Sequence, residues 1–235
     1  VYKRQPLISV IMPLYNAERF VGESICNILG QTVGDFELIV IDDASTDSSY
    51  DIASRYAAQD ARIVLMRNDA NHGAAYTRNR GLETARGSFI TFMDADDRCS
   101  PERFARQTAF FGQHPQIDLC GSYYTMFGPD DAREQKIQDP ITHEGIRIQM
   151  LFGCPFAMSG VMMRRGAFLR SGVRFRATMA EDYLFWAELS GHMRMANIPE
   201  HLSFYRRWEN QLSTSQLDRQ TLSAQAIQRD LLRTT

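Results

Sequence analysis

Closely spaced carboxylates follow two apolar segments in the first half of the chain. One segment reads Phe89-Ile-Thr-Phe-Met-Asp94-Ala-Asp96-Asp97, and the other reads Leu38-Ile-Val-Ile-Asp42-Asp43. Carboxylates at such short spacing repel one another unless a cation lies between them, and hard divalent cations prefer oxygen ligands. A cation held at the edge of a sheet can in turn hold a diphosphate. The two acidic segments therefore predict a divalent-cation site that binds a phosphorylated ligand.

Asp94 and Asp96 are the first candidates for metal ligands. They occupy alternate positions at the end of a predicted strand, so their side chains should converge on one side. The alternative is a solvated acidic turn before the next helix. Asp42 and Asp43 can accept hydrogen bonds from a nucleobase or from ribose hydroxyls. The alternative is that Asp42, Ser45 and Asp47 only cap the helix that follows them.

Aromatic and basic side chains lie close to these acids in the sequence. Tyr15, in Pro13-Leu-Tyr15-Asn16, follows the first predicted strand, and its ring can stack on a base or pack within the protein. Arg78 and Arg80 precede the acidic strand. Either guanidinium could bind a phosphate or remain on the surface.

Glu181 and Asp182 open a predicted helix in the second half of the chain. Acids in a first helical turn are favoured by the helix dipole, so capping alone explains them. The functional alternative is a general base that takes a proton from an acceptor hydroxyl.

The first half alternates short apolar segments with helical patterns, which is typical of βαβ units and a parallel sheet. The patterns predict strands at residues 7–12, 36–41, 63–66 and 89–93, and helices at 17–29, from about 48, and at 74–85. Pro13 should end the first strand, and Ser100-Pro101-Glu102-Arg103 predicts a helix start. Because carboxyl ends of parallel strands meet at one sheet edge, the candidate residues should meet there.

The pattern is less regular after residue 111. It predicts strands near residues 117–122, 159–163 and 201–206, and helices near 143–152, 181–190 and 216–232. Residues 128–140 are polar and aperiodic, which predicts a loop or crossover. We expect a single domain over residues 1–235, with a nucleotide-binding half at about 7–122 and an acceptor half with a C-terminal helix at about 123–235. The apolar face of that helix suits this chain or a partner equally, so the oligomeric state stays open.

The composition excludes several classes of protein. The 235 residues are 44% hydrophobic and 23% charged, as in ordinary globular proteins, and the net charge of −2 gives no general attraction to nucleic acid. Four widely spaced cysteines predict free thiols, and five scattered histidines predict no zinc site. No segment has membrane-span length and the N-terminus lacks a signal-peptide pattern. We expect a cytoplasmic protein, with peripheral association at the inner face of the membrane left open.

Taken in order, these segments resemble the family 2 glycosyltransferases, which are inverting enzymes with the GT-A fold. The match is dense over residues 7–111 and thin beyond, and its segments are Ser9-Val-Ile-Met-Pro13-Leu-Tyr15-Asn16, Phe36–Asp47, Gly73–Gly81, Ala85–Asp97 and Pro101-Glu-Arg103. The resemblance implies an α/β fold in which a Rossmann-like, mostly parallel central sheet is flanked by helices. A less regular acceptor-binding half should follow.

The resemblance also implies a reaction and the residues that perform it. A sugar would pass from a nucleotide-sugar donor, usually a UDP-sugar bound with Mn²⁺ or Mg²⁺, to a glycan or lipid-linked acceptor. Asp94 and Asp96 match the DxD metal site, and Asp182 after Glu181 matches the general base. The positions that match the nucleotide site, with Asp43 on the uracil, are Pro13, Tyr15, Asn16, Asp42, Asp43, Arg78, Asp94 and Ala95.

Three positions depart from the family pattern. Ala44 replaces a frequent glycine, and Met158 replaces a histidine on the acceptor side. Trp208 stands where members often have a histidine that completes the metal shell, and an indole cannot ligate a metal. Arg207-Trp208 is similar to a pair in processive polysaccharide synthases, but the glutamine that precedes it there is missing, so we expect a non-processive enzyme.

Other classes explain the sequence less well. A DxD phosphatase should carry its motif after the first strand with a threonine behind it, whereas Arg98 and Cys99 follow the motif here. A dehydrogenase should have GxGxxG after the first strand. A catalytically degenerate nucleotide-binding module of the same fold remains the alternative, because Met158 and Trp208 replace functional histidines.

Overall fold

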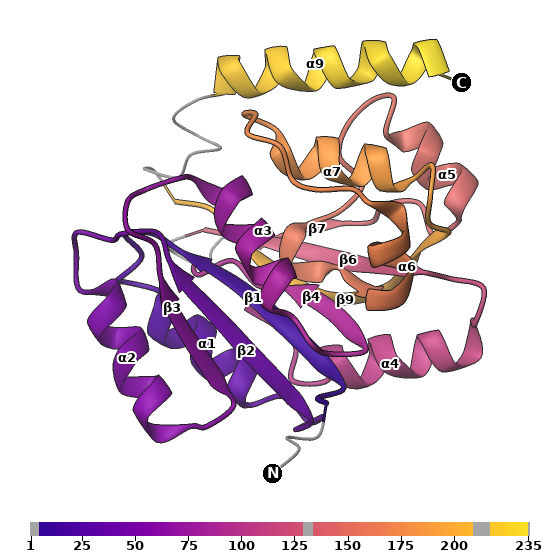
Figure 1. The fold of residues 1–235 in the computed structure, drawn as a ribbon. Coiled ribbons are helices and arrows are strands. Elements are labelled where there is room, and N and C mark those ends of the chain that lie inside the picture. Colours follow the sequence, from indigo (N-terminus) through magenta and orange to yellow (C-terminus); the bar gives the residue numbers. More distant parts are fainter. Residues whose placement is uncertain (1–4, 129–133, 209–216, 235) are drawn as a thin grey trace.

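The computed structural model describes residues 5–128, 134–208 and 217–234. The strands in these residues are β1 (Ile8–Leu14), β2 (Phe36–Asp42), β3 (Ile63–Arg67), β4 (Phe89–Phe92), β5 (Arg98–Cys99), β6 (Leu119–Phe127), β7 (Gln135–Ile137), β8 (Met162–Arg164) and β9 (Met195–Arg206). They form one mixed sheet in the order β3-β2-β1-β4-β8-β6-β9-β5, and β7 pairs with β6 (Figure 1).

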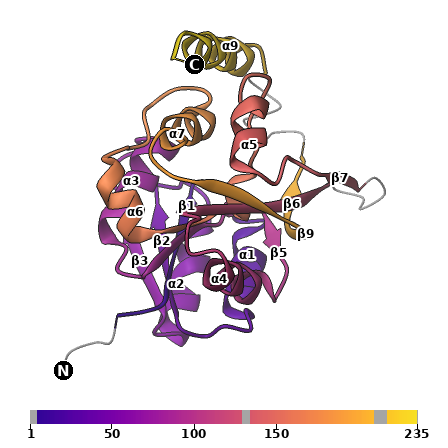
Figure 2. The same cartoon turned by 90° about the vertical axis from the view of Figure 1, so that its right-hand side faces the viewer.

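Helices cover both faces of this sheet. They are α1 (Val21–Leu29), α2 (Ser49–Gln59), α3 (Ala74–Thr84), α4 (Arg103–Gln113), α5 (His143–Gln149), the 3-10 turn η1 (Met158–Gly160), α6 (Arg165–Ser171), α7 (Glu181–Leu189) and α9 (Leu217–Thr234). Helices α1, α2 and α4 lie on one face, and α3, α6 and α7 lie on the other (Figure 2). Helix α9 packs on α7 (Figure 1).

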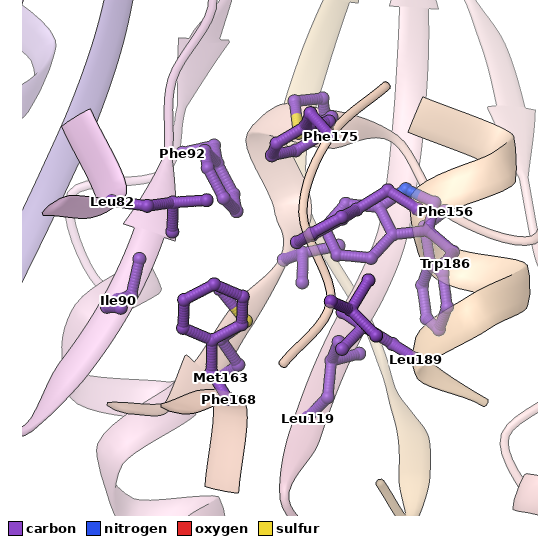
Figure 3. Packing of buried hydrophobic residues seen from close by; sticks show 14 of the residues in the cluster. Leu82, Ile90, Phe92, Leu119, Phe156, Met163, Phe168, Phe175, Trp186 and Leu189 are labelled. Atoms are coloured by element: carbon purple, nitrogen blue, oxygen red, sulfur yellow. The ribbon is translucent and has the colours of Figure 1, made fainter. Parts of the chain in front are cut away.

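The two faces have separate apolar cores because alternate residues of a strand point to opposite faces. Ile11 of β1 belongs to the cluster beneath α3, α6 and α7, whereas its neighbours Val10 and Met12 belong to the cluster beneath α1, α2 and α4. Aromatic rings fill the first cluster (Figure 3). The ring of Phe92 lies 6.1 Å from that of Trp186, so the end of β4 is packed against α7.

Strands β3, β2, β1 and β4 are parallel neighbours, as the alternating pattern predicts. Their carboxyl ends therefore meet at one edge. Strand β1 does not stop at Pro13, as the sequence suggested, but continues to Leu14. Its pairing with β4 ends at Ile11, while its pairing with β2 continues to Leu14. Pro13 lies in the stretch that has lost the β4 partner, so its missing N–H costs no ladder hydrogen bond.

Several predicted boundaries in the second half were wrong. A strand, β7, lies within the segment predicted as a loop or crossover, and α6 was not predicted at all. Strand β6 runs to Phe127 rather than residue 122, and β9 begins at Met195 rather than residue 201. Helix α4 begins at Arg103, because residues 100–102 form a turn before it. Among the described residues, no helix combines the length and apolar composition needed to cross a bilayer.

Candidate active site

A cavity of about 770 Å³ opens at the edge where β1, β2 and β4 end. Its walls come from both halves of the chain, because residues that follow these strands face residues of η1, α7 and the end of β9. The predicted site residues that line it are Pro13, Tyr15, Asn16, Asp43, Arg78, Asp94, Ala95, Asp96, Glu181 and Asp182. The structure therefore brings together ten of the positions singled out from the sequence.

The loop after β1 is tied to the loop after β2. Asn16 has a positive φ of 46°, and its side-chain oxygen accepts a hydrogen bond from the backbone N–H of Thr46 at 2.9 Å. The N–H of Asn16 donates to the Ser45 hydroxyl at 3.1 Å. These contacts fix the two loops against each other. Tyr15, next to Asn16, remains 47% exposed, so its ring is free to contact a ligand in the cavity.

Asp42 and Asp43 have different environments although they are adjacent. The Asp42 side chain is fully buried and is absent from the cavity wall. It forms an ion pair with Arg67 Nε at 3.0 Å and accepts a hydrogen bond from the Ser45 N–H at 3.2 Å. The Asp43 carboxylate lines the cavity. It accepts three hydrogen bonds, from Asn68 Nδ2 at 2.6 Å and from the backbone N–H groups of residues 72 and 73 at 3.0 and 2.7 Å. Asp43 thus organises the loop that precedes α3.

Arg78 lies in the cavity, whereas the other candidate, Arg80, points to the loop after β3. The guanidinium of Arg78 is only 8% exposed and bridges two carboxylates, with Nη2 3.0 Å from Asp94 and Nη1 2.7 Å from Glu181. Burial alone would lower the pKa of Arg78, but the negative charges of Asp94 and Glu181 outweigh it and raise that pKa. Arg78 is therefore a fixed positive charge at the centre of the site.

Asp96 and Asp97 carry negative charge in a desolvated position. Burial and the charge of Asp94 raise the pKa of Asp96, while the indole N–H of Trp208 acts in the opposite direction. Burial and the neighbouring acids raise the pKa of Asp97 well above its usual range. The side chain of Asp97 does not line the cavity; it accepts hydrogen bonds from the Ser159 hydroxyl at 2.6 Å and from the Arg206 N–H at 2.9 Å. Asp97 therefore anchors the acidic loop to η1 and β9.

These acids provide a setting that suits a divalent cation. Asp94 and Asp96 line the cavity, and the Arg78 guanidinium pairs with Asp94. Burial, and after it the charge of the neighbouring carboxylates, raise the pKa values of Asp96 and Asp97. Among the described residues no three acidic, histidine or cysteine side chains form a closed metal cage. Mg²⁺-type sites commonly use one or two carboxylates and take the remaining ligands from substrate phosphates and water. The residues present fit that type of site.

Asp182 lies in the first turn of α7, on the opposite wall of the cavity. Burial, and after it the negative charge of Glu181, raise the pKa of Asp182 to about 6, although Arg78 partly opposes them. The Asp182 carboxylate accepts a hydrogen bond from the N–H of Tyr183 at 2.7 Å. A carboxyl with a pKa near 6 can accept a proton close to neutral pH, which is the property that a general base needs.

Part of the cavity wall was not foreseen from the sequence. Aromatic and sulfur-containing side chains line the wall that comes from the second half of the chain: Tyr124, Met126, Cys154, Phe156, Met179 and Tyr205. Tyr124 and Met126 alternate on the extension of β6 beyond the predicted end, so a longer strand would have revealed them. Ser159 and Arg206, which hold the acidic loop, lie within or next to segments where the family resemblance is thin and were not singled out.

Comparisons with known proteins show the family and the fold of the chain. The family model for glycosyl transferase family 2 matches residues 9–172. An uncharacterized glycosyltransferase of Haemophilus influenzae is 33% identical over 235 residues, which cover 96% of this chain and 73% of that protein.

Two solved structures share the fold. S. aureus TarS 1–349 in complex with UDP-GlcNAc superposes with a TM-score of 0.75 at 24% identity, over 88% of this chain and 60% of that one. The Pyrobaculum calidifontis mannosyltransferase in complex with GDP-Man and Mn²⁺ gives a TM-score of 0.71 at 19% identity, over 94% of this chain and 65% of that one. The chain thus spans less than two thirds of either solved neighbour. It has the GT-A fold and belongs to glycosyl transferase family 2, the glycosyltransferases that the sequence resembles.

Proposed function

We propose that this glycosyltransferase moves one sugar from a nucleotide-sugar donor, most suitably a UDP-sugar, to a hydroxyl group of a glycan or a lipid-linked acceptor. One observation carries the proposal. A single cavity is lined both by the loops that follow β1, β2 and β4 and by Asp182, whose pKa of about 6 suits a general base. Donor and acceptor can therefore meet in front of a group able to take the acceptor's proton.

The donor would occupy the side of the cavity formed by Pro13, Tyr15, Asn16, Asp43 and Ala95. Tyr15 offers an exposed ring for stacking on the base. A carboxylate has about four lone-pair positions, so Asp43, with three of them taken, retains one acceptor position for a base N–H. Asp42 would not contact the nucleotide and would act indirectly, by holding the loop that follows β2. The UDP-GlcNAc bound to TarS supports this class of donor.

Asp96 and Asp94 would hold the divalent cation, Mn²⁺ or Mg²⁺, together with the donor diphosphate. The cation would neutralise the charge that develops on the leaving diphosphate. The Mn²⁺ in the complex of the mannosyltransferase supports this assignment. Arg78, already fixed between Asp94 and Glu181, adds a positive charge on the same wall of the cavity.

Asp182 would remove the proton from the acceptor hydroxyl as that oxygen attacks the anomeric carbon. The bond from the anomeric carbon to the donor phosphate oxygen breaks as the new glycosidic bond forms, so one displacement inverts the configuration. The proton resides on the Asp182 carboxylate until it exchanges with water. Burial keeps Asp182 basic enough for this step, and Arg78 limits how far its pKa rises.

The aromatic side of the cavity would take the acceptor. Tyr124, Phe156 and Tyr205 offer flat apolar faces, and such faces suit the C–H surface of a sugar ring. The single-domain organisation, a cytoplasmic location and peripheral membrane association stay predictions, and no single acceptor is preferred within the glycan and lipid-linked classes.

Calorimetric titration with UDP, GDP and CDP, each with and without Mn²⁺, tests the donor site. We expect selective, Mn²⁺-dependent binding of UDP.

Asp182→Asn should retain that binding and lose transfer by about 10²- to 10⁴-fold, as expected for loss of a general base. Asp51→Asn on the exposed side of α2 is the matched control and should behave like the parent. Nucleotide binding by a parent protein that transfers no sugar would instead favour the degenerate nucleotide-binding module, and absence of any nucleotide binding would contradict the donor site. Full transfer by Asp182→Asn would place the base elsewhere.

A further inference from the structure

Trp208, two residues beyond the end of β9, is in direct contact with the proposed metal ligand. Its indole Nε1 donates a hydrogen bond to Asp96 Oδ2 at 2.9 Å. The indole ring also packs against Phe20, with 5.6 Å between ring centroids, and the residue lines the cavity. The residue that replaces the family's histidine is therefore part of the acidic site rather than a neutral surface substitution.

The two acids of the DxD pair have different partners. Asp94 is paired with the guanidinium of Arg78 at 3.0 Å, which compensates its charge. The side-chain partner of Asp96 is the uncharged indole of Trp208. Among the described residues Asp96 forms no comparable ion pair, although the charge of Arg206 acts on it, so its carboxylate is the one more open to a cation.

The position of Trp208 is fixed by the residue two places before it. Arg206 donates from its backbone N–H to Asp97 and from Nε to the Asp96 carbonyl oxygen, at 2.9 and 2.6 Å. Its guanidinium also binds Glu23 at 2.6 Å and lies over the Phe20 ring, 4.6 Å from the centroid. The end of β9 and the acidic loop are thus joined before Trp208 begins, so the indole is presented to Asp96 by a fixed backbone.

We propose that Trp208 is a positioning residue for the metal site: its indole N–H holds one oxygen of Asp96, and the carboxylate is thereby oriented to bind a divalent cation together with the donor diphosphate. This inference rests on the proposed function. Ligating carboxylates are commonly held by hydrogen bonds of this kind, and loss of such a partner typically lowers metal affinity by about 10- to 100-fold. Trp208 would thus act on the cation through Asp96, without coordinating it.

The opposite effect of the same contact is competition. If the cation needed the oxygen that the indole occupies, Trp208 would weaken metal binding, and its removal would strengthen it. The fixed presentation of the indole favours positioning, because a competing group would have to leave each time the cation binds. Removal of the indole N–H should weaken cation binding if Trp208 positions Asp96, and should strengthen it if Trp208 competes with the cation.

Trp208→Phe tests the positioning role, because this substitution keeps an aromatic ring against Phe20 and removes the N–H donor. Bound and free Mn²⁺ are measured by electron paramagnetic resonance in the presence of UDP, and UDP affinity is measured by calorimetry with and without Mn²⁺. We expect about 10-fold weaker Mn²⁺ binding and an unchanged metal-free affinity for UDP. A merely structural role would weaken UDP binding equally with and without the metal.

Asp96→Asn gives the lower limit of Mn²⁺ affinity in this experiment, because it keeps an acceptor for the indole N–H and removes the charge that binds the cation. Mn²⁺ binding by Trp208→Phe that equals or exceeds that of the parent would overturn the positioning role while leaving the proposed function intact. A parent protein whose UDP affinity ignores Mn²⁺ would overturn both the metal assignment and this inference.

Discussion

Arg78 and Glu181 form an ion pair with an Nη1–Oε1 distance of 2.7 Å, although 103 positions separate them in the sequence. The pair joins α3, in the first half of the chain, to the first turn of α7, which carries Asp182. The same guanidinium binds Asp94 at 3.0 Å. One side chain therefore connects the acidic loop, where the donor phosphates are proposed to bind, with the helix that carries the proposed base.

Arg78→Met should destabilise the protein strongly. Removal of the guanidinium leaves Asp94 and Glu181 without their charge partner in a largely desolvated position, and removal of one partner of a buried pair costs about 3–5 kcal/mol. Urea unfolding measures the change in the free energy of unfolding. Arg80→Met is the control, because Arg80 binds the neutral oxygens of residues 67 and 68, and about 1 kcal/mol is expected there. An equal decrease in the free energy of unfolding of both variants would contradict the role of Arg78 as the charge partner of Asp94 and Glu181.

The rate of transfer should follow the ionisation of Asp182. A general base acts when deprotonated, so kcat/KM should be constant above the pKa of about 6 and fall tenfold per pH unit below it. Glu181→Gln removes a negative charge that raises this pKa, so the midpoint should move to lower pH. Glu188→Gln, farther along α7 and paired with Arg176, is the control and should leave the midpoint in place. A midpoint that moves upward in Glu181→Gln would contradict the proposed electrostatic coupling.

The fold of the first half of the chain was largely predictable because its sequence signals are local. Apolar segments of four to seven residues ending in acids predicted β2 and β4, and the helix predicted at residues 17–29 contains α1, which begins four residues later. Parallel pairing then required the strand ends to meet. The same reasoning placed Asp43, Asp94 and Asp96 in one cavity.

The fold of the second half was less predictable because its elements depend on partners that are distant in the sequence. Strand β9 continues through Pro199 and Glu200, which have no partners in the pairing with β6 because the register shifts between Ile198 and His201. A proline and an acid in sequence suggest the end of a strand, and only the pairing with β6 reveals a bulge. The Arg78–Glu181 pair and the contact of Trp208 with Asp96 likewise require the complete fold, since no local pattern brings these side chains together.

Asp43→Ala should affect both stability and the choice of nucleotide. The loop before α3 loses an acceptor for three hydrogen bonds, and buried donors left without partners cost about 1–3 kcal/mol each. If Asp43 also accepts a hydrogen bond from the N3–H of uracil, the affinity for UDP should fall. The affinity for CDP should change little, because cytosine lacks that N–H group. Calorimetry with both nucleotides measures the ratio, and Asp51→Ala on α2 is the control. An equal loss for UDP and CDP would show that Asp43 acts only through the loop.

Ala44→Gly should stabilise the protein. Ala44 has a φ of 58°, in the left-handed region where a Cβ atom costs about 1–2 kcal/mol. Glycine removes that cost but adds about 0.4–1 kcal/mol of conformational entropy to the unfolded chain, so a net gain of about 0.5–1 kcal/mol is expected. Ala58→Gly, on the exposed side of α2, tests the opposite case: its helical backbone gains nothing from glycine, and a loss of about 1 kcal/mol is expected. Chemical unfolding of the two variants should give changes of opposite sign, and a loss in both would mean that the turn after Asp43 is not strained by its alanine.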